Sequence, residues 1–418
     1  MSDIKDEVSG PVAPGSRSAS ATSVEVPSYL PRRTLGQMLR GDLGFIPVLI
    51  TLIVIVIFFS IITNGVFLKP ENLSNLVLQI ATIGILGLGE ILVLLLGEID
   101  LSVASVCYLC AVIMGVLSER AGASAGVAIT VALLAGALIG FVNGLFVAVL
   151  RVPSFIVTLA GSIGYAGLLL ALLNGQSTLI ITNPFIIAIA GSPESFLPNA
   201  LGVGLPLIAV ALYVFSLIVN HVRRQRAGLK TGSLFQLVAK IVAAVVIVVG
   251  AVVLFQSYNG VPYSFGILFG LILLFWLILT RTSFGRHVYA VGGNSEAARR
   301  AGINIVGIRI AVFTLCSLLA AVGGVILASY TNSAASQISP TLLLDAIAAA
   351  VIGGVSLFGG RGSVWAIVLG VLIIGSLENG LALKSQGTDV SEMVEGAVLV
   401  LAVTVDAVVR RLQARSGR

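Results

Sequence analysis

Long runs of consecutive apolar residues, separated by short polar stretches, organise most of this chain. A membrane-spanning helix needs about 20 predominantly apolar residues. Measured against that length, the runs predict helices near 46–63, 74–97, 102–118, 125–149, 154–173, 202–219, 235–256, 262–279, 308–330, 341–358, 363–383 and 391–409. Continuous rather than alternating runs favour helices over a β-barrel. We therefore expect an all-α, polytopic transmembrane bundle of about 12 helices, within a range of roughly 10–12.

The composition also indicates a membrane protein. Of the 418 residues, 57% are hydrophobic and only 10% are charged, whereas soluble domains carry about 25% charged residues. The first 40 residues differ, because they are rich in Ser, Pro, Ala and charge and show no apolar periodicity. We expect 1–40 to be a disordered cytosolic tail and 41–418 to be the transmembrane domain. The run at 46–62 is long for a signal peptide and no A-x-A-like site follows it, which favours an uncleaved first helix.

The distribution of Lys and Arg predicts the orientation in the membrane. With the N-terminus in the cytosol, alternating helices place these basic residues in inward loops or tails: Arg151, Arg223, Arg224, Arg226, Lys230, Arg281, Arg286, Arg299, Arg300, Arg309, Arg361, Arg410, Arg411, Arg415 and Arg418. The outward loops receive only Lys69, Arg120 and Lys384. Both termini are therefore predicted to be cytosolic. The loop 174–201 contains no Lys or Arg and is predicted to face outward, as a candidate docking surface.

The polar stretch 280–310 lies between two apolar segments and contains a short capped-helix pattern. Asn294 or Ser295 can act as the N-cap, Glu296 suits the first turn, and Gly302 suits the C′ position. A polar helix between two membrane spans is typical of a contact with a cytosolic partner, so we expect the loop 281–307 to be a coupling element. Its contact residues are expected to be Asn294, Glu296, Ala297, Ala298, Arg299, Arg300, Gly302 and Ile303.

Ionisable and polar residues within the apolar segments are candidates for function, because such groups are costly at membrane depth. The candidate pathway residues are Glu90, Asn143, Asp345, Glu378 and Asn379. A polar turn formed by Gly97, Glu98, Asp100 and Ser102 lies between two apolar helices. Structural roles compete with these functional ones. Asp100 and Ser102 can cap the helix that begins near Leu101, and Asp345 can stabilise a first turn.

Several motifs of soluble enzymes are absent from the sequence. There is no G-x-x-x-x-G-K-[ST], so the chain has no P-loop of its own for ATP, and there is no H-E-x-x-H or G-x-S-x-G. We expect a transporter subunit rather than an enzyme, without a cofactor or metal, and the net charge of +6 reflects membrane topology rather than nucleic-acid binding. Cys107, Cys110 and Cys316 lie in apolar runs and are expected to be packing residues. The energy for transport must then come from an ion gradient or a separate ATPase.

Two motifs resemble those of a known family. Glu296-Ala297-Ala298 followed by Gly302 resembles the E-A-A…G motif of ATP-binding-cassette (ABC) transporter permeases. The stretch 97–103 resembles the G-x-I-D-L-S-V motif of the ribose/xylose/arabinose/galactose branch, and the blocks 152–161 and 289–299 are similar to that branch as well. The resemblance covers roughly 45–410 and is greatest to the xylose type. Ala104 departs from the usual Gly, from which we expect only a local packing change.

The resemblance implies a multi-pass permease of the bacterial inner membrane that imports a monosaccharide, D-xylose or a related pentose. It also implies three partners: a cytosolic ATPase subunit, a periplasmic sugar-binding protein and a second copy of the permease in a homodimer. Membrane lipids are further expected partners. Two other classes remain open. One is a secondary transporter with Glu90, Asp100 and Asp345 as ion ligands, and the other is a channel or structural membrane scaffold.

Overall fold

The structure of this chain is a computed structural model that describes residues 46–191, 195–229 and 233–385, with isolated positions between 387 and 404. The chain divides into the units 1–43 and 44–418, and every helix and strand described below belongs to the second unit. The predicted tail at 1–40 lies outside the described residues, as does most of the predicted helix at 391–409.

Nine helices in the described part of the chain are long and apolar enough to cross a membrane. They are α3 (Pro70–Leu95), α4 with the π-helical turn η2 (Val103–Gly115 and Val116–Arg120), α5 (Ala125–Ala148), α6 (Ser154–Leu173), α8 (Asn199–Arg226), α9 (Leu234–Gln256), α10 (Tyr263–Arg281), α13 (Ile305–Thr331) and α15 (Ala366–Leu383). Shorter apolar helices are α2 (Ile46–Ile62) and α14 (Pro340–Ile352), and a 3-10 turn, η1 (Val66–Leu68), follows α2. The predicted polytopic helical fold is confirmed, and every helix predicted within the described ranges corresponds to one of these.

The predicted boundaries were wrong around two helices. The predicted helix 341–358 ends at Ile352, the next begins at Ala366, and the chain between them is irregular. Gly354, Gly359, Gly360 and Gly362 in this loop all have positive φ, which glycine adopts at little cost and other residues do not. At 1.5 Å per residue α14 is about 20 Å long, shorter than the hydrocarbon core of about 30 Å. The other difference is at α8, which extends past 219 to Arg226 and carries a basic last turn.

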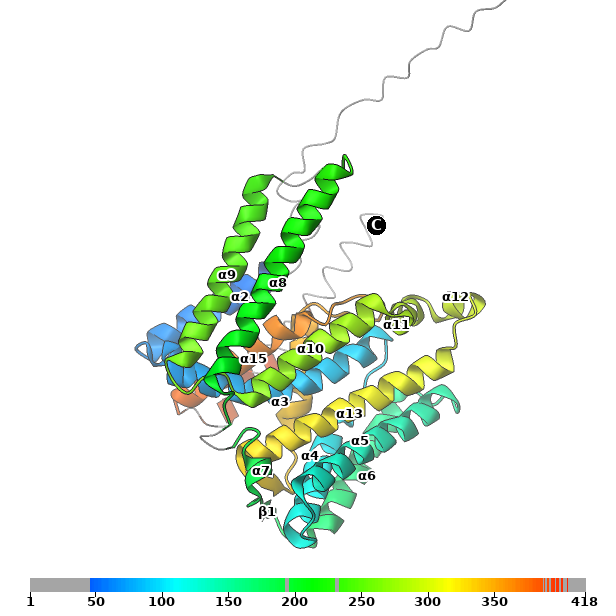
Figure 1. Cartoon of the computed structure of the whole chain (residues 1–418). Helices are drawn as coiled ribbons and strands as arrows, with labels where there is room; N and C mark the ends of the chain where they lie inside the picture. The colour runs from blue at the N-terminus through cyan, green and yellow to red at the C-terminus, as the bar shows by residue number, and fades with distance from the viewer. Residues whose placement is uncertain are drawn as a thin grey trace, which may run out of the picture. The chain divides into compact units, whose positions relative to one another are not determined.

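Helix α3 lies at the centre of the packing, since 94% of its most apolar 18-residue stretch is buried. It packs against α10, α13, α14 and α15, while α13 also packs along α5 (Figure 1). Glycines allow these close approaches, since a Cβ at Gly140 on α5 would lie 2.3 Å from the carbonyl oxygen of Phe313 on α13. The hairpin of α8 and α9 is the opposite case. Only 11% of the most apolar 18-residue stretch of α8 is buried, and only 6% of that of α9. Most of the apolar residues of this hairpin are therefore exposed at the surface of the single chain.

Contacts between helix ends form two groups that agree with the predicted alternation across the membrane. In one group, the N–H of Gly360 donates to the carbonyl of Leu95 at 2.9 Å, and the N–H of Ile99 donates to Ser154 Oγ at 3.4 Å. In the other, strand β1 (Thr178–Ile180) pairs antiparallel with β2 (Ser333–Ala335), and the N–H of Leu197 donates to Val261 at 2.8 Å. The assignment of the first group to the cytosol is a prediction from the Lys and Arg distribution.

Candidate functional site

The predicted capped helix in the polar stretch is confirmed as α12 (Ser295–Arg300). Asn294, rather than Ser295, is the N-cap, and its Oδ1 accepts the N–H of Ala297 at 2.9 Å. Gly302 has a φ of +80° and donates its N–H to Arg299, while Ile303 donates to Ala298. These two bonds are the pattern of a Schellman C-cap. The short helix is therefore fixed at both ends by local backbone chemistry.

Helix α12 presents a polar surface to solvent and is anchored by two apolar side chains. The exposed residues of α12 and its caps are Asn294, Glu296, Ala297, Arg299, Arg300, Ala301 and Gly302. Glu296 and Arg299 form an ion pair at 2.7 Å with both side chains more than half exposed, which contributes little to stability. Ala298 is buried, and Ile303 packs against the main core. The exposed surface is therefore free to contact another protein without disturbing the anchor.

A second helix in this stretch, α11 (Ser283–Gly293), was not predicted. Its signals were present in the sequence, because Thr282 is a good N-cap and the apolar residues Phe284, Val288 and Val291 recur at helical spacing. In the structure Thr282 Oγ1 accepts the N–H of Gly285 at 3.3 Å, and Val288 and Val291 are buried. The polar stretch 280–310 therefore contains two helices, of which α11 packs against the membrane helices and α12 lies beyond it (Figure 1).

Four glycines bring the end of α11 into backbone contact with the end of α3 and with the loop 353–365. A Cβ at Gly292 would lie 1.7 Å from the carbonyl oxygen of Leu95 and 2.8 Å from the nitrogen of Gly360. A Cβ at Gly359 would lie 2.7 Å from the oxygen of Gly292 and 2.8 Å from the nitrogen of Gly97. We call Gly97, Gly292, Gly359 and Gly360 the glycine junction. At the glycine junction the three segments therefore meet backbone on backbone, with no side chain between them.

Two side-chain contacts reinforce the glycine junction. Tyr289 on α11 donates its hydroxyl to the carbonyl of Gly362 at 3.0 Å. Burial raises the pKa of the Tyr289 phenol, so the hydroxyl keeps the proton that it donates. Glu98 forms an ion pair with Arg309, near the start of α13, with 3.0 Å between Oε1 and the guanidinium nitrogen. Glu98 and Arg309 were each noted in the sequence, but no pattern there indicates that they pair.

Asp100 is fully buried in the turn 97–102 that follows α3, which we call the acidic turn. Its Oδ1 accepts the N–H of Ser102 at 2.9 Å and the Ser102 hydroxyl at 2.6 Å. The capping prediction needs a correction of position, because α4 begins at Val103 and the residue at the N-cap is Ser102, whose side chain makes no capping bond. Asp100 instead closes an Asx-type turn just before the helix. The Cys316 thiol on α13 also lies close enough to interact with the Asp100 carboxylate.

A chain of hydrogen bonds links this turn to α5 and α6. Asn143 on α5 donates to Ser102 Oγ at 3.2 Å, and Tyr165 on α6 donates to Asn143 Oδ1 at 2.7 Å. Thr158, also on α6, accepts the N–H of Leu101 at 2.9 Å. Of the candidate pathway residues, Asn143 is therefore the one that is hydrogen-bonded to the acidic turn. Tyr165 and Thr158 were missed, because nothing in the sequence near them indicates a partner on another helix.

The other candidate pathway residues do not form one cluster. Glu90 is fully buried in α3, close to both the carboxylate and the backbone N–H of Asp100. Asn379 on α15 accepts from Asn72 at 2.8 Å and donates to Gln79 at 3.2 Å, so it belongs to a separate group beside α3. The remaining two are buried Asp345 on α14 and half-buried Glu378 on α15.

The loop 174–201 has a definite structure in its described part. It contains β1 and a short helix, α7 (Pro184–Ile187), capped by Asn183, whose Oδ1 accepts the N–H of Phe185 at 3.1 Å. Arg120 donates to the carbonyls of Leu172 and Leu173 just before the loop. Phe185 is 77% exposed. An ordered loop with an exposed aromatic side chain suits a docking surface.

The comparisons with known proteins place the chain in one family. The family model described as "Branched-chain amino acid transport system / permease component" matches residues 72–403. The xylose transport system permease protein XylH of Escherichia coli is 38% identical over 360 residues, which cover 86% of this chain and 91% of that protein. The fructose import permease protein FrcC of Rhizobium meliloti is 30% identical over 386 residues, covering 91% of each.

The ribose import permease protein RbsC of Escherichia coli is 33% identical over 366 residues, covering 86% of this chain and 92% of that protein. No solved structure matches the chain. The family description mentions amino acids while these relatives are named for sugars, so family membership alone does not fix the substrate. The chain is a multi-pass transporter subunit of the bacterial inner membrane, not an enzyme, and it belongs to the family of branched-chain amino acid transport system / permease components.

Proposed function

We propose that this chain is the permease of a binding-protein-dependent ABC importer that passes a monosaccharide into the cytoplasm. The supporting relatives are named for the transport of xylose, fructose and ribose. D-Xylose or a related pentose is the proposed substrate, because the xylose permeases show the highest identity of these three. The chain has no P-loop motif, so ATP hydrolysis belongs to a separate cytosolic ATPase subunit.

The observation that carries this proposal is the glycine junction between the coupling helices and the end of α3. An ATPase that grips the exposed surface of α12 would do so by a helix-in-groove contact. The contact residues are Asn294, Glu296, Ala297, Arg299, Arg300 and Gly302, with Ala298 and Ile303 as the anchor. A movement of α12 is then transmitted through α11 to Leu95, Gly97 and the acidic turn. The glycine junction transmits it because its contacts are between backbone atoms, with no flexible side chain to absorb the displacement.

A chain of hydrogen bonds continues from the acidic turn to α5 and α6, so the movement can reach these two helices. Asp100, Ser102, Asn143 and Tyr165 connect the acidic turn to α5 and α6. A neutral sugar is recognised by hydroxyl, amide and aromatic groups, which Ser102, Asn143 and Tyr165 supply. We propose that this chain of groups lies along the sugar pathway, with Glu90 beside it. Asp345, Glu378 and Asn379 remain proposed pathway residues on the neighbouring helices.

Two further partners belong to the proposal. The periplasmic sugar-binding protein docks on the loop 174–201, which carries no basic residue and exposes Phe185. A second copy of the permease completes a homodimer. The support for the homodimer is the resemblance to ABC permeases, since each importer uses a pair of membrane subunits to enclose one pathway.

The test is uptake into proteoliposomes that hold the permease with its ATPase and supply the binding protein outside. Labelled D-xylose, L-arabinose, D-ribose and D-fructose are compared with ATP inside, with ATP omitted, and with a protonophore added. We expect ATP-dependent pentose uptake that the protonophore leaves unchanged. Uptake abolished by the protonophore at constant ATP would refute the proposal and favour ion coupling through Glu90 and Asp100. Uptake of hexose alone would refute only the choice of substrate.

A further inference from the structure

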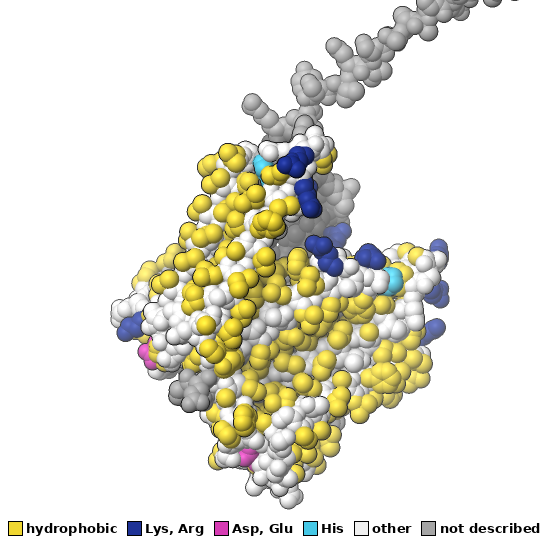
Figure 2. All heavy atoms as spheres, in the orientation of Figure 1, with side chains coloured by type: hydrophobic (Ala, Val, Ile, Leu, Met, Phe, Trp, Pro, Cys, Tyr) yellow, Lys and Arg dark blue, Asp and Glu magenta, His cyan; other side chains and the backbone are white. Residues whose placement is uncertain are grey.

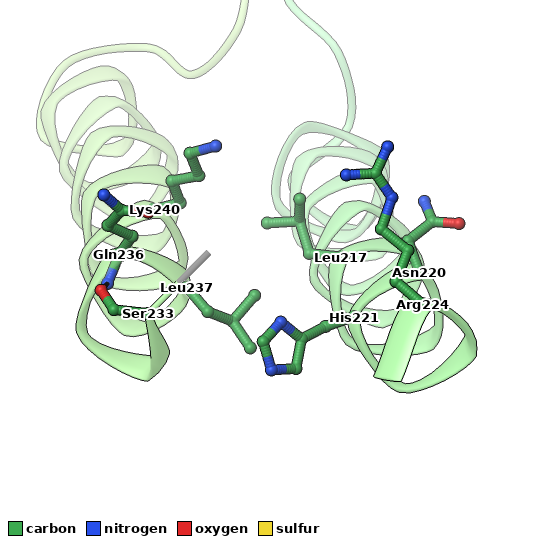
Figure 3. Close-up of a pocket in the computed structure, with 8 residues that line it drawn as sticks. All are labelled: Leu217, Asn220, His221, Arg224, Ser233, Gln236, Leu237 and Lys240. Atoms are coloured by element: carbon green, nitrogen blue, oxygen red, sulfur yellow. Dashed lines mark hydrogen bonds between the residues drawn. The ribbon is translucent and has the colours of Figure 1, made fainter. Parts of the chain in front are cut away.

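A cleft of roughly 370 Å³ lies between the ends of α8 and α9 and is not used by the proposed transport mechanism. It is lined by Leu217, Asn220, His221 and Arg224 from α8 and by Ser233, Gln236, Leu237 and Lys240 from α9 and its N-cap. Figure 3 shows Arg224 and Lys240 extending from opposite walls, while His221 and Leu237 meet between the two helices. The cleft therefore combines two fixed cations, polar groups and an apolar floor.

Lys240 is in an unusual position for a charged residue. It lies about 9 Å along α9 from the start of the helix, at 1.5 Å per residue, inside a strongly apolar sequence. Charged groups at such a depth are costly unless they have a partner or reach the interface. In the sequence, Lys240 lies within the apolar run 235–256. Its side chain instead lines the cleft, opposite Arg224.

The positive charge of the hairpin has no counterpart in this part of the chain. No Asp or Glu occurs anywhere between positions 195 and 295, whereas α8 ends with Arg223, Arg224 and Arg226 and α9 carries Lys240. Figure 2 shows Lys and Arg side chains at this end of the hairpin, above a face covered with hydrophobic side chains. Phe215 on α8 and Val238 on α9 are 65% and 48% exposed. An occupant must therefore offer negative charge and apolar surface together.

We propose that the cleft binds the headgroup of an anionic phospholipid, with the phosphate between Arg224 and Lys240 and the acyl chains along the apolar faces of α8 and α9. The N-cap Ser233 and the amides of Asn220 and Gln236 give the headgroup hydrogen-bonding partners. A soluble phosphate satisfies the cations but not the apolar surface, and a zwitterionic lipid satisfies the surface but brings its own cation. The bound lipid holds α8 and α9 at a fixed separation, in a hairpin that otherwise has few protein contacts.

The test is a lipid titration of the full-length permease in nonionic detergent, followed by native mass spectrometry. Dioleoyl phosphatidylglycerol is compared with dioleoyl phosphatidylcholine. The Arg224→Gln/Lys240→Gln variant removes the two cations of the cleft. The matched control is Arg223→Gln/Arg226→Gln, which removes two charges from the same last turn of α8 but none from the cleft lining.

The wild-type protein is expected to prefer phosphatidylglycerol. The Arg224→Gln/Lys240→Gln variant should lose roughly tenfold or more in affinity for it, and the control variant less than about threefold, since each cation near an anionic headgroup contributes on the order of 1 kcal/mol. Equal losses in the two variants would refute a defined site and indicate general charge attraction. Displacement of phosphatidylglycerol by millimolar inorganic phosphate would refute the lipid and assign the cleft to a soluble anion. Equal binding of both lipids by the wild type would also overturn the proposal.

Discussion

The glycine junction makes a quantitative prediction at Gly292. A Cβ at this position would lie 1.7 Å from the carbonyl oxygen of Leu95, and real Cβ atoms essentially never approach a heavy atom closer than 3.0 Å. A methyl group there forces α11 and the end of α3 apart by about 1.3 Å, and such overpacking typically costs about 1–3 kcal/mol. The displacement also stretches the hydrogen bond from Gly360 to Leu95, which is 2.9 Å long. Gly292→Ala should therefore destabilise the protein and weaken coupling.

The adjacent glycine provides a matched control. A Cβ at Gly293 would meet no atom within 4 Å, and both glycines lie within α11. Gly293→Ala should therefore be neutral or stabilising, because alanine exceeds glycine in helix propensity by up to about 1 kcal/mol.

The assays are thermal unfolding of the purified permease in detergent and substrate-stimulated ATP hydrolysis of the assembled importer. We expect Gly292→Ala to melt at a lower temperature than Gly293→Ala and to hydrolyse ATP with little response to sugar. If the two variants show the same melting temperature and the same stimulation, α11 does not press on α3 as described. The role of the glycine junction in coupling would then be refuted. A loss of stability with normal stimulation would refute only the coupling role.

Three other predictions use local geometry. Asp100→Asn should preserve sugar uptake better than Asp100→Leu, because Asn keeps an acceptor for the Ser102 N–H and hydroxyl; equal loss of uptake with normal membrane insertion would show that the charge itself is needed. Gly302→Glu should reduce ATPase stimulation more than Gly302→Asn, because Asn tolerates the left-handed backbone found at this position; unchanged stimulation in both would exclude α12 as the coupling element. A cysteine at Phe185 should react with an impermeant reagent in intact spheroplasts and one at Ser233 should not, whereas Ser195 is a poor site because it is fully buried; the reverse labelling would overturn the topology.

The sequence by itself determined the elements whose causes are local. Apolar runs of sufficient length predicted the membrane helices, because a helix in lipid satisfies its own backbone within one segment. Asn294 and Gly302 fixed the two ends of α12, since a cap depends on residues only a few positions apart. The same approach failed at the loop 353–365, where apolar residues continue but glycines with positive φ end the helix. The motifs around Gly97 and Glu296 also identified the family that the comparisons then showed.

Only the tertiary structure decided which of these elements meet. Nothing near Gly292 in the sequence indicates that its backbone lies against Leu95 and Gly360, and nothing near Asn143 indicates Ser102 and Tyr165 as its partners. In the sequence the candidate pathway residues are all polar groups within apolar runs and cannot be told apart. In the structure, Asn143 is hydrogen-bonded to Ser102 in the acidic turn, whereas Asn379 is hydrogen-bonded to Asn72. These contacts depend on the crossing and rotation of whole helices, which are set by packing along their full length. A local pattern reports the preference of each segment, but the partner of a buried polar group is fixed by the sum of many weak contacts elsewhere in the bundle.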